Sequence, residues 1–143
     1  MTTPASPAAS LRGHLDAMHA ARPGVLAGRD VEALHKLRVS IRRIRSLLKA
    51  SHQSLPDGGK RFAEDFRWLG AVTTHARDLD VFAGWLAGQQ DPDLQPLLAA
   101  VDRQRAAEAA SLRAALSCDR YDDLVTAFGS MLDAAPGSAA GAA

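Results

Sequence analysis

Apolar residues recur at steps of three and four along most of the chain. Between residues 60 and 87 they are Phe62, Phe66, Leu69, Val72, Ala76, Leu79, Ala83 and Leu86. This spacing is typical of α-helices that bury one face, whereas a half-buried strand would alternate apolar and polar positions. No segment of the sequence alternates in that way. The pattern therefore predicts an all-α protein, an antiparallel helical bundle of about five helices.

Proline, glycine and capping residues mark the ends of the expected helices. The first helix runs from Leu11 to about residue 21 and stops at Pro23. The second begins after Asp30, a good N-cap, and continues to about residue 52. The third spans residues 60–87 and closes at Gly88, which is expected to be a C′ glycine.

Two more helices are expected in the second half of the chain. The fourth opens with Asp91 as its cap and Pro92 at its first position, and it runs to about residue 117. The fifth is capped by Asp119 and ends at Pro136. Its apolar face is Tyr121, Leu124, Val125, Phe128 and Leu132.

The chain has 143 residues, of which 47% are apolar, enough for one domain with a substantial core. Residues 1–9 and 135–143 have the Ala, Ser, Pro and Gly composition of disordered tails, which leaves residues 10–134 as the expected helical domain. The single cysteine, Cys118, excludes an internal disulfide framework and fits a reducing compartment. No apolar run approaches the roughly 18 residues of a membrane span, so we expect a cytoplasmic protein with no membrane partner.

The net charge of +1 hides a segregation of charge along the chain. Residues 1–61 have a net charge of +7, and residues 62–143 have a net charge of −6. Residues 35–49 hold six cations, and residues 33–56 contain no Asp or Glu. Such a cluster indicates an anionic partner that binds at one place.

The second helix carries two parallel stripes. Its buried seam is expected at Leu34, Leu37, Ile41, Ile44 and Leu48. One residue further on, the same steps of three and four are repeated in a set that we call the cationic stripe: His35, Arg38, Arg42, Arg45 and Lys49. The cationic stripe is about 21 Å long at 1.5 Å per residue. Arginine presents a planar fork of donors that matches phosphate oxygens, so these residues are the candidate binding site.

Three arrangements could accommodate these charges. The side chains could lie along apolar surface with their charges in water, or carboxylates of the acidic half could neutralise them in a structural network. The third arrangement is an extended polyanion or an anionic partner surface, which we favour, because like charges in one row repel by about 0.2–0.5 kcal/mol per contact. His35 is either a hydrogen-bonded core residue or a donor to a phosphate oxygen at the head of the stripe.

Two motifs lie in these helices. One, H-x-x-R-V-x-x-R-R-x-R, is formed by His35, Arg38, Val39, Arg42, Arg43 and Arg45. The other, R-D-x-D-V, is formed by Arg77, Asp78, Leu79, Asp80 and Val81. In this order the two motifs resemble those of the CHAD family, the conserved histidine α-helical domain. Thr73 and Thr74 stand where that family usually has Leu-Gly.

The resemblance implies a domain that binds inorganic polyphosphate without catalysis, through the cationic stripe. CHAD domains consist of two related helical bundles around a basic groove or pore, and they are associated with polyphosphate granules. The resemblance covers residues 10–134, which correspond to the first bundle only. Further partners are therefore a second copy of this chain or a second CHAD half, and we expect polyphosphate to bridge a mainly monomeric protein.

Other chemistry has less support in the sequence. Asp78 and Asp80 diverge by about 200° on a helix and cannot share a metal ion, so we expect Arg77 and these acids to orient the basic helix from behind. The sequence has no nucleophile elbow or Gly-rich phosphate loop, and we expect no catalysis, metal or cofactor. The alternative functions are nucleic-acid binding and a scaffold that docks an acidic protein surface. Nucleic-acid binding is disfavoured because no aromatic residue lies among residues 35–49.

Three further side chains are given roles by their positions in the helical pattern. Trp68 and Trp85 are expected to be packing residues. Arg105 is in line with Val101 and Leu112 and is expected to be a buried or groove-facing cation.

Overall fold

The computed structural model describes residues 6–28, 31–55 and 59–135. Within these ranges it contains helices and no strand, as the sequence predicted. The elements in chain order are α1 (Pro7–Ala27), α2 (Val31–Ser51), η1 (His52–Ser54), α3 (Lys60–Gly88), η3 (Pro92–Leu94), α4 (Gln95–Leu116) and α5 (Asp119–Ala134). The parts of the predicted tails at residues 1–5 and 136–143, and the predicted cap Asp30, lie outside the described residues. No helix in the described ranges is both long enough and apolar enough to cross a membrane.

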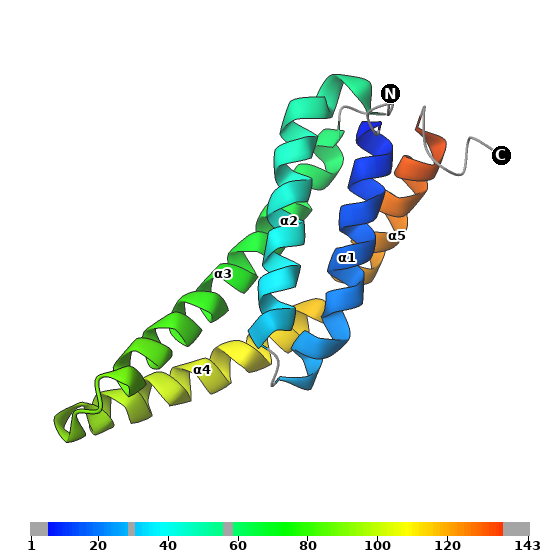
Figure 1. The fold of residues 1–143 in the computed structure, drawn as a ribbon. Coiled ribbons are helices and arrows are strands. Elements are labelled where there is room, and N and C mark those ends of the chain that lie inside the picture. The colour runs from blue at the N-terminus through cyan, green and yellow to red at the C-terminus, as the bar shows by residue number, and fades with distance from the viewer. Residues whose placement is uncertain (1–5, 29–30, 56–58, 136–143) are drawn as a thin grey trace.

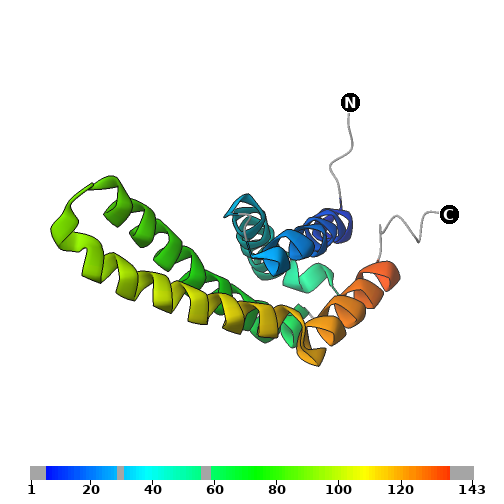
Figure 2. The ribbon, with the colours of Figure 1, turned by 90° about the horizontal axis from the view of Figure 1, so that it is seen from below.

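The helices form a bundle from which one helical pair projects. α1, α2, α5 and the first half of α3 lie side by side, while the second half of α3 and the first half of α4 continue beyond the start of α2 as an antiparallel pair (Figures 1 and 2). We call this projecting pair the distal hairpin (residues 79–101). It has a small apolar cluster of its own, built from Leu79, Ala83, Leu86 and Val101, which is separate from the main core.

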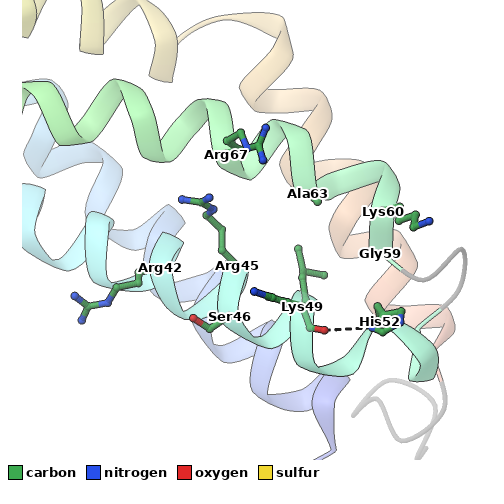
Figure 3. Close-up of a pocket in the computed structure, with 10 residues that line it drawn as sticks. Arg42, Arg45, Ser46, Lys49, His52, Gly59, Lys60, Ala63 and Arg67 are labelled. Atoms are coloured by element: carbon green, nitrogen blue, oxygen red, sulfur yellow. Dashed lines mark hydrogen bonds between the residues drawn. The ribbon is translucent and has the colours of Figure 1, made fainter.

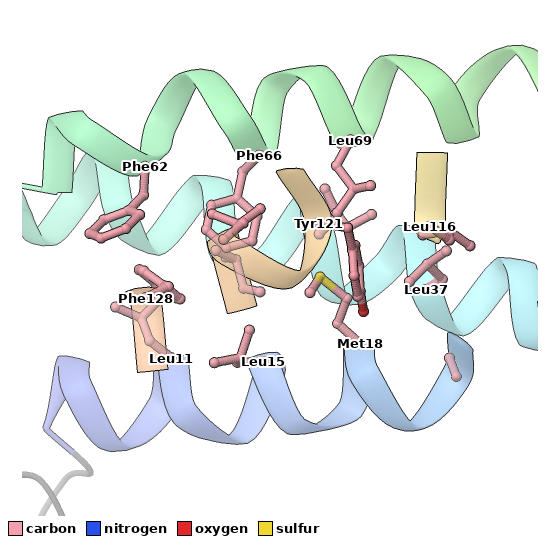
Figure 4. Close-up of a cluster of buried hydrophobic side chains, with 14 of the residues drawn as sticks. Leu11, Leu15, Met18, Leu37, Phe62, Phe66, Leu69, Leu116, Tyr121 and Phe128 are labelled. Atoms are coloured by element: carbon pink, nitrogen blue, oxygen red, sulfur yellow. The ribbon is translucent and has the colours of Figure 1, made fainter. Parts of the chain in front are cut away.

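The main core lies where α1, α2, α3 and α5 meet (Figure 4). Phe128 of α5 packs edge-to-face against Phe62 and Phe66 of α3, with ring centroids 5.1 and 4.9 Å apart. From α1, Leu11, Leu15 and Met18 face the same cluster. The interleaved steps of three and four on each helix produce this core, because they place the large apolar side chains on one side of each helix.

Helix α1 is longer at both ends than the sequence predicted. It begins at Pro7, inside the stretch predicted as a tail, where Ser6 accepts a hydrogen bond from the Ala9 backbone N–H. It also continues through Pro23 and ends at Ala27, followed by Gly28 as the C-cap with a φ of 78°. The predicted stop at Pro23 was wrong. Val25 is buried, and the free energy gained by burying it in one more turn of helix outweighs the backbone hydrogen bond that proline cannot donate.

Two other predicted caps are displaced. Gly88 is still helical, and the residue with a positive φ after α3 is Gln90, at 52°. Asp119 is the first residue of α5, and Cys118 occupies the N-cap position. Asp91 does cap as predicted, by accepting a hydrogen bond of 2.9 Å from the Asp93 backbone N–H, although the first turn after it is the short 3-10 helix η3.

The predicted apolar faces are largely confirmed, with two differences on α3. Val72 is only partly buried, and Thr73 beside it is 1% exposed because the seam of α3 passes through position 73. Trp85 was predicted to pack and is instead 59% exposed, with its ring stacked on Phe82 at the surface of the distal hairpin. Trp68 does pack against the main core, and the guanidinium of Arg120 lies 4.3 Å from its ring centroid.

Candidate functional site

Helix α2 separates its apolar and basic residues as the sequence predicted. The five seam residues are all buried: Leu34, Leu37, Ile41, Ile44 and Leu48. Of the cationic stripe, Arg38 is partly buried and the other four side chains are exposed. The buried seam fixes the rotation of α2, so the stripe is turned toward one neighbouring element, helix α3.

Two hollows follow one another along the junction of α2 and α3, and we call them together the α2–α3 groove. The wide hollow has a volume of about 670 Å³ and lies toward the end of α2 and the start of α3 (Figure 3). The narrow hollow has a volume of about 170 Å³ and lies toward the start of α2. Arg42 and Arg45 line both hollows, so the two are neighbours along the groove.

The groove brings together all five residues of the cationic stripe. His35 and Arg38 line the narrow hollow, Arg42 and Arg45 line both, and Lys49 lines the wide one. Figure 3 shows Arg45 extending from α2 toward α3, across the groove. The exposed position of His35 excludes its role as a core residue.

The second wall of the groove contains cations that sequence reasoning did not assign to the site. Lys60 and Arg67 of α3 line the wide hollow, with Lys60 at its rim and pointing away from it, and His52 lies at the same end. Lys60 and Arg67 are seven residues apart and therefore share a face of α3. That spacing is visible in the sequence, but only the packing of α3 beside α2 places these two residues opposite the stripe.

Gly70 allows the two walls to approach. A Cβ added at position 70 would lie 3.3 Å from Nη1 of Arg45 and 3.6 Å from Cγ2 of Ile41. The Gly70 carbonyl accepts hydrogen bonds from the hydroxyls of Thr73, at 3.0 Å, and Thr74, at 2.8 Å. The Arg45 side chain can therefore pass close to the backbone of α3 at this point. Both threonine hydroxyls already donate a hydrogen bond within α3.

Among the residues that the structure describes, the lining of the groove contains cations and no carboxylate. Among the described residues, Arg67 of the lining is in an ion pair, with its Nη1 3.8 Å from Oε2 of Glu64 on the same helix. Other ion pairs lie elsewhere and include Arg12 with Asp133, Arg120 with Asp65 at 2.8 Å, and His75 with Glu108 at 3.5 Å. None of these pairs involves a residue of the cationic stripe. The alternative in which the acidic half neutralises the stripe is therefore absent from the described part of the chain.

The acids of the second motif have a different role from the one predicted. Arg105 of α4 donates a hydrogen bond of 3.0 Å from Nε to Asp80 and one of 3.2 Å from Nη1 to Asp102. Burial lowers the pKa of Arg105, but the hydrogen bonds and charges of these two carboxylates outweigh it and raise the pKa above its ordinary value. Asp80 thus joins α3 to α4, so the role predicted for this acid, to orient α2, was wrong.

The described residues contain no group of three or more His, Cys, Asp or Glu side chains placed to hold a metal ion. Asp78 is exposed, while Asp80 faces Arg105, so these two carboxylates do not converge. The groups that the described part of the groove offers a ligand are therefore fixed cations and two imidazoles, those of His35 and His52.

Comparison with known proteins places this geometry in a family. No curated protein matches the chain. The chain is similar to a solved structure described as the crystal structure of the CHAD domain from the plant Ricinus communis, with 29% sequence identity and a TM-score of 0.76. The match covers 92% of this chain and 47% of that one, so this chain spans about half the length of the plant protein's chain. The family model for the CHAD domain matches residues 9–143, and the protein therefore belongs to the CHAD domain family.

Proposed function

We propose that this protein binds inorganic polyphosphate, without catalysis, in the α2–α3 groove. The observation that carries the proposal is the wide hollow, whose lining, as far as the structure describes it, has five cationic side chains from two helices and no carboxylate: Arg42, Arg45, Lys49, Lys60 and Arg67. Of these, Arg67 has an ion-pair partner, Glu64, 3.8 Å away. A chain of phosphates supplies closely spaced negative charges with oxygen acceptors all along it. Arginine forks bind such oxygens with two parallel hydrogen bonds.

Membership of the CHAD family supports the same ligand class, because this family is known for binding polyphosphate. The groove also suits polyphosphate better than nucleic acid. Among the described residues, no Phe, Tyr or Trp side chain lines either hollow, so bases would lack a large ring on which to stack. The partners expected from the sequence, polyphosphate granules and a second copy or second CHAD half, and the cytoplasmic location, remain part of this proposal.

The test is a competition at fixed salt between labelled polyphosphate and unlabelled DNA, RNA or an acidic peptide. We expect polyphosphate to compete best. Binding should also weaken with salt, and the slope of log K against log salt should fall by about one for each groove cation removed. A variant with alanine at Arg38, Arg42, Arg45 and Lys49 should lose most of the affinity.

A matched control removes the same number of charges outside the groove. Alanine at Lys36, Arg43, Arg103 and Arg113, which are all exposed and line neither hollow, should lower the affinity only slightly. Equal losses in the two variants would show that net charge, and not the groove, determines binding. Binding that is insensitive to salt would contradict the proposal, and stronger competition by DNA, RNA or the peptide would select one of the alternative functions.

A further inference from the structure

The α3 wall of the groove continues past the residues that line its narrow hollow. From α3 these residues are Gly70, Thr73 and Thr74. Arg77 comes seven, four and three residues after them, so it lies on the same face of α3, one turn further along the helix. This wall therefore has three basic residues, spread over about 25 Å at 1.5 Å per residue. They are Lys60, Arg67 and Arg77.

The packing of the two helices places Arg77 level with the head of the cationic stripe. Leu34 of α2 and Ala76 of α3 line the same hollow, which also borders α4. His35 and Arg77 follow these two residues in the chain, so they lie at the same level along the two helices. Arg77 does not itself line the narrow hollow in this structure. Side chains on a helix lean over the turn that precedes them, so a long side chain at position 77 reaches back toward that hollow.

The charge of Arg77 lacks compensation from the described part of the chain. Arg77 is partly buried, yet no ion pair or hydrogen bond between described residues involves its side chain. The acid three residues after it, Asp80, accepts a hydrogen bond of 3.0 Å from Arg105 instead. Removing a charge partly from water is costly unless an opposite charge compensates it. Arg77 thus has the character of a cation whose partner comes from outside the chain.

Arg38 is in the same situation on the opposite wall. It is also partly buried, it lines the narrow hollow, and its Nε has no hydrogen-bond partner among the described residues. A buried donor without an acceptor costs free energy, which an anion between the two walls would recover. Arginines on both sides of one short stretch of the groove can bind a single anion together, each with a planar fork of donors.

We propose that Arg77 binds phosphate groups of the polyphosphate chain, so that the bound chain follows α3 past His35 with cations on both walls. This inference rests on the proposed function. It gives the arginine of the R-D-x-D-V motif a ligand-binding role, in place of the expected role of orienting α2 from behind. It also lengthens the site beyond the cationic stripe, and each further phosphate that meets a cation adds to the affinity through counterion release.

The experiment measures the affinity of the protein for long-chain polyphosphate by calorimetry at a series of salt concentrations. We expect Arg77→Ala to weaken binding about tenfold, the loss of one charge-assisted contact. The slope of log K against log salt should fall by about one. Arg77→Lys should keep the slope, because the charge remains, and should still bind more weakly than the wild type.

Arg103→Ala is the matched control for charge. Arg103 is exposed on α4 and lines none of the four hollows that border the described helices, so its loss should leave the slope unchanged and the affinity nearly so. An equal effect of Arg77→Ala and Arg103→Ala would show that Arg77 acts only through net charge, and would overturn the inference.

Chemical modification gives a second readout that does not depend on a variant. Phenylglyoxal reacts with accessible guanidinium groups, and mass spectrometry of peptides gives the rate at each arginine. Bound polyphosphate should slow the modification of Arg77 and leave that of Arg103 unchanged. This readout and Arg77→Lys decide the question if urea unfolding shows that Arg77→Ala is not folded.

Failure of this inference can be distinguished from failure of the proposed function. Suppose that alanine at the four stripe cations abolishes binding, while Arg77→Ala keeps the wild-type affinity and salt slope and polyphosphate does not protect Arg77. Binding in the groove would then stand, and the role of Arg77 would be overturned. A wild-type protein that does not bind polyphosphate would overturn both.

Discussion

Gly70 is the residue on which the approach of the two groove walls depends. We predict that Gly70→Ala lowers polyphosphate affinity several-fold, because the added Cβ would displace the Arg45 guanidinium, 3.3 Å away. Stability should not fall, since Arg45 is a flexible side chain and alanine is favoured over glycine inside a helix by about 1 kcal/mol. Calorimetric titration and urea unfolding measure the two effects separately.

Gly84 on the same helix is the matched control. A Cβ at position 84 meets nothing within 4 Å, so Gly84→Ala should raise the free energy of unfolding by a similar amount and leave the affinity unchanged. If both variants bind polyphosphate as the wild type does, the position of Arg45 is not important for binding.

The ionisation of Tyr121 should make the stability of the folded protein depend on pH in the alkaline range. Its side chain is completely buried, and burial raises its pKa to about 12 from an ordinary value of 10. The folded state thus favours the neutral phenol. The contribution of Tyr121 to the free energy of unfolding is therefore complete below pH 10 and is lost as pH rises from 10 to about 12. We predict that the free energy of unfolding falls by about 2 kcal/mol over this range through Tyr121.

Urea unfolding at a series of pH values tests this loss, with Tyr121→Phe as the comparison. The variant lacks the hydroxyl that lies 3.1 Å from Nδ1 of His19, so it should be less stable at neutral pH by about 1 kcal/mol. Its stability should then decline less steeply above pH 10. A parallel decline in both proteins would assign the effect to other groups.

The residues of the cationic stripe could be predicted from the sequence because all five lie on one helix, where spacing alone defines a face. Lys60 and Arg67 could not, since their place in the groove depends on how α3 packs beside α2. The partner of Asp80 was missed for the same reason. Its spacing gives its face on α3, but the sequence does not say that Arg105 of α4, 25 residues away, faces it.

Among the elements, α1 contains a proline that the fold tolerates at a cost. Pro23 is exposed, and it cannot donate a backbone hydrogen bond to the carbonyl of His19. We predict that Pro23→Ala raises the free energy of unfolding by about 1–3 kcal/mol, because it restores that donor and removes a steric clash. Chemical denaturation followed by circular dichroism measures the change.

Pro7 is the control for this prediction. It is the first residue of the same helix, where a backbone N–H would have no helical partner, so Pro7→Ala should leave stability nearly unchanged. Equal effects at the two positions would mean that the substitutions act mainly on the unfolded chain.

The number and type of the helices could be predicted because periodicity reports directly on burial. Their ends were less predictable. Pro23 and Gly88 are ordinary stop signals, yet the burial of Val25 and of Leu86 holds the surrounding turns in helix. Local stop signals have energies of about 1–3 kcal/mol, which is comparable to the free energy of burying one large apolar side chain. A tertiary contact can therefore decide where a helix ends.

At the scale of the whole molecule, the groove and the distal hairpin have opposite effects on association. The exposed side chains of Val81, Phe82, Trp85 and Leu97 favour association, whereas the groove cations of two copies repel. We predict that the free protein is mainly monomeric and that long polyphosphate promotes dimers or larger assemblies, because one polyphosphate chain can bridge several protein molecules. Light scattering with and without ligand measures this.

The outcomes of that measurement differ in meaning. A tight dimer without ligand, unaffected by salt, would show that the apolar side chains of the distal hairpin form the interface. A protein that stays monomeric at saturation would show that one groove occupies a whole chain. Assemblies that grow with chain length would show that one polyphosphate chain binds several protein molecules along its length.

The separate apolar cluster of the distal hairpin divides the molecule into parts that need not open together. The hairpin is held by Leu79, Ala83, Leu86 and Val101 and by the ion pairs of Arg105, a small set beside the main core. Its amide protons should therefore exchange with solvent sooner than those of α2, and a protease should cut first near Gln90. The groove lies on the part of α3 that belongs to the main core, where Phe66 and Leu69 are buried. The binding surface should therefore keep its shape while the distal hairpin unfolds locally.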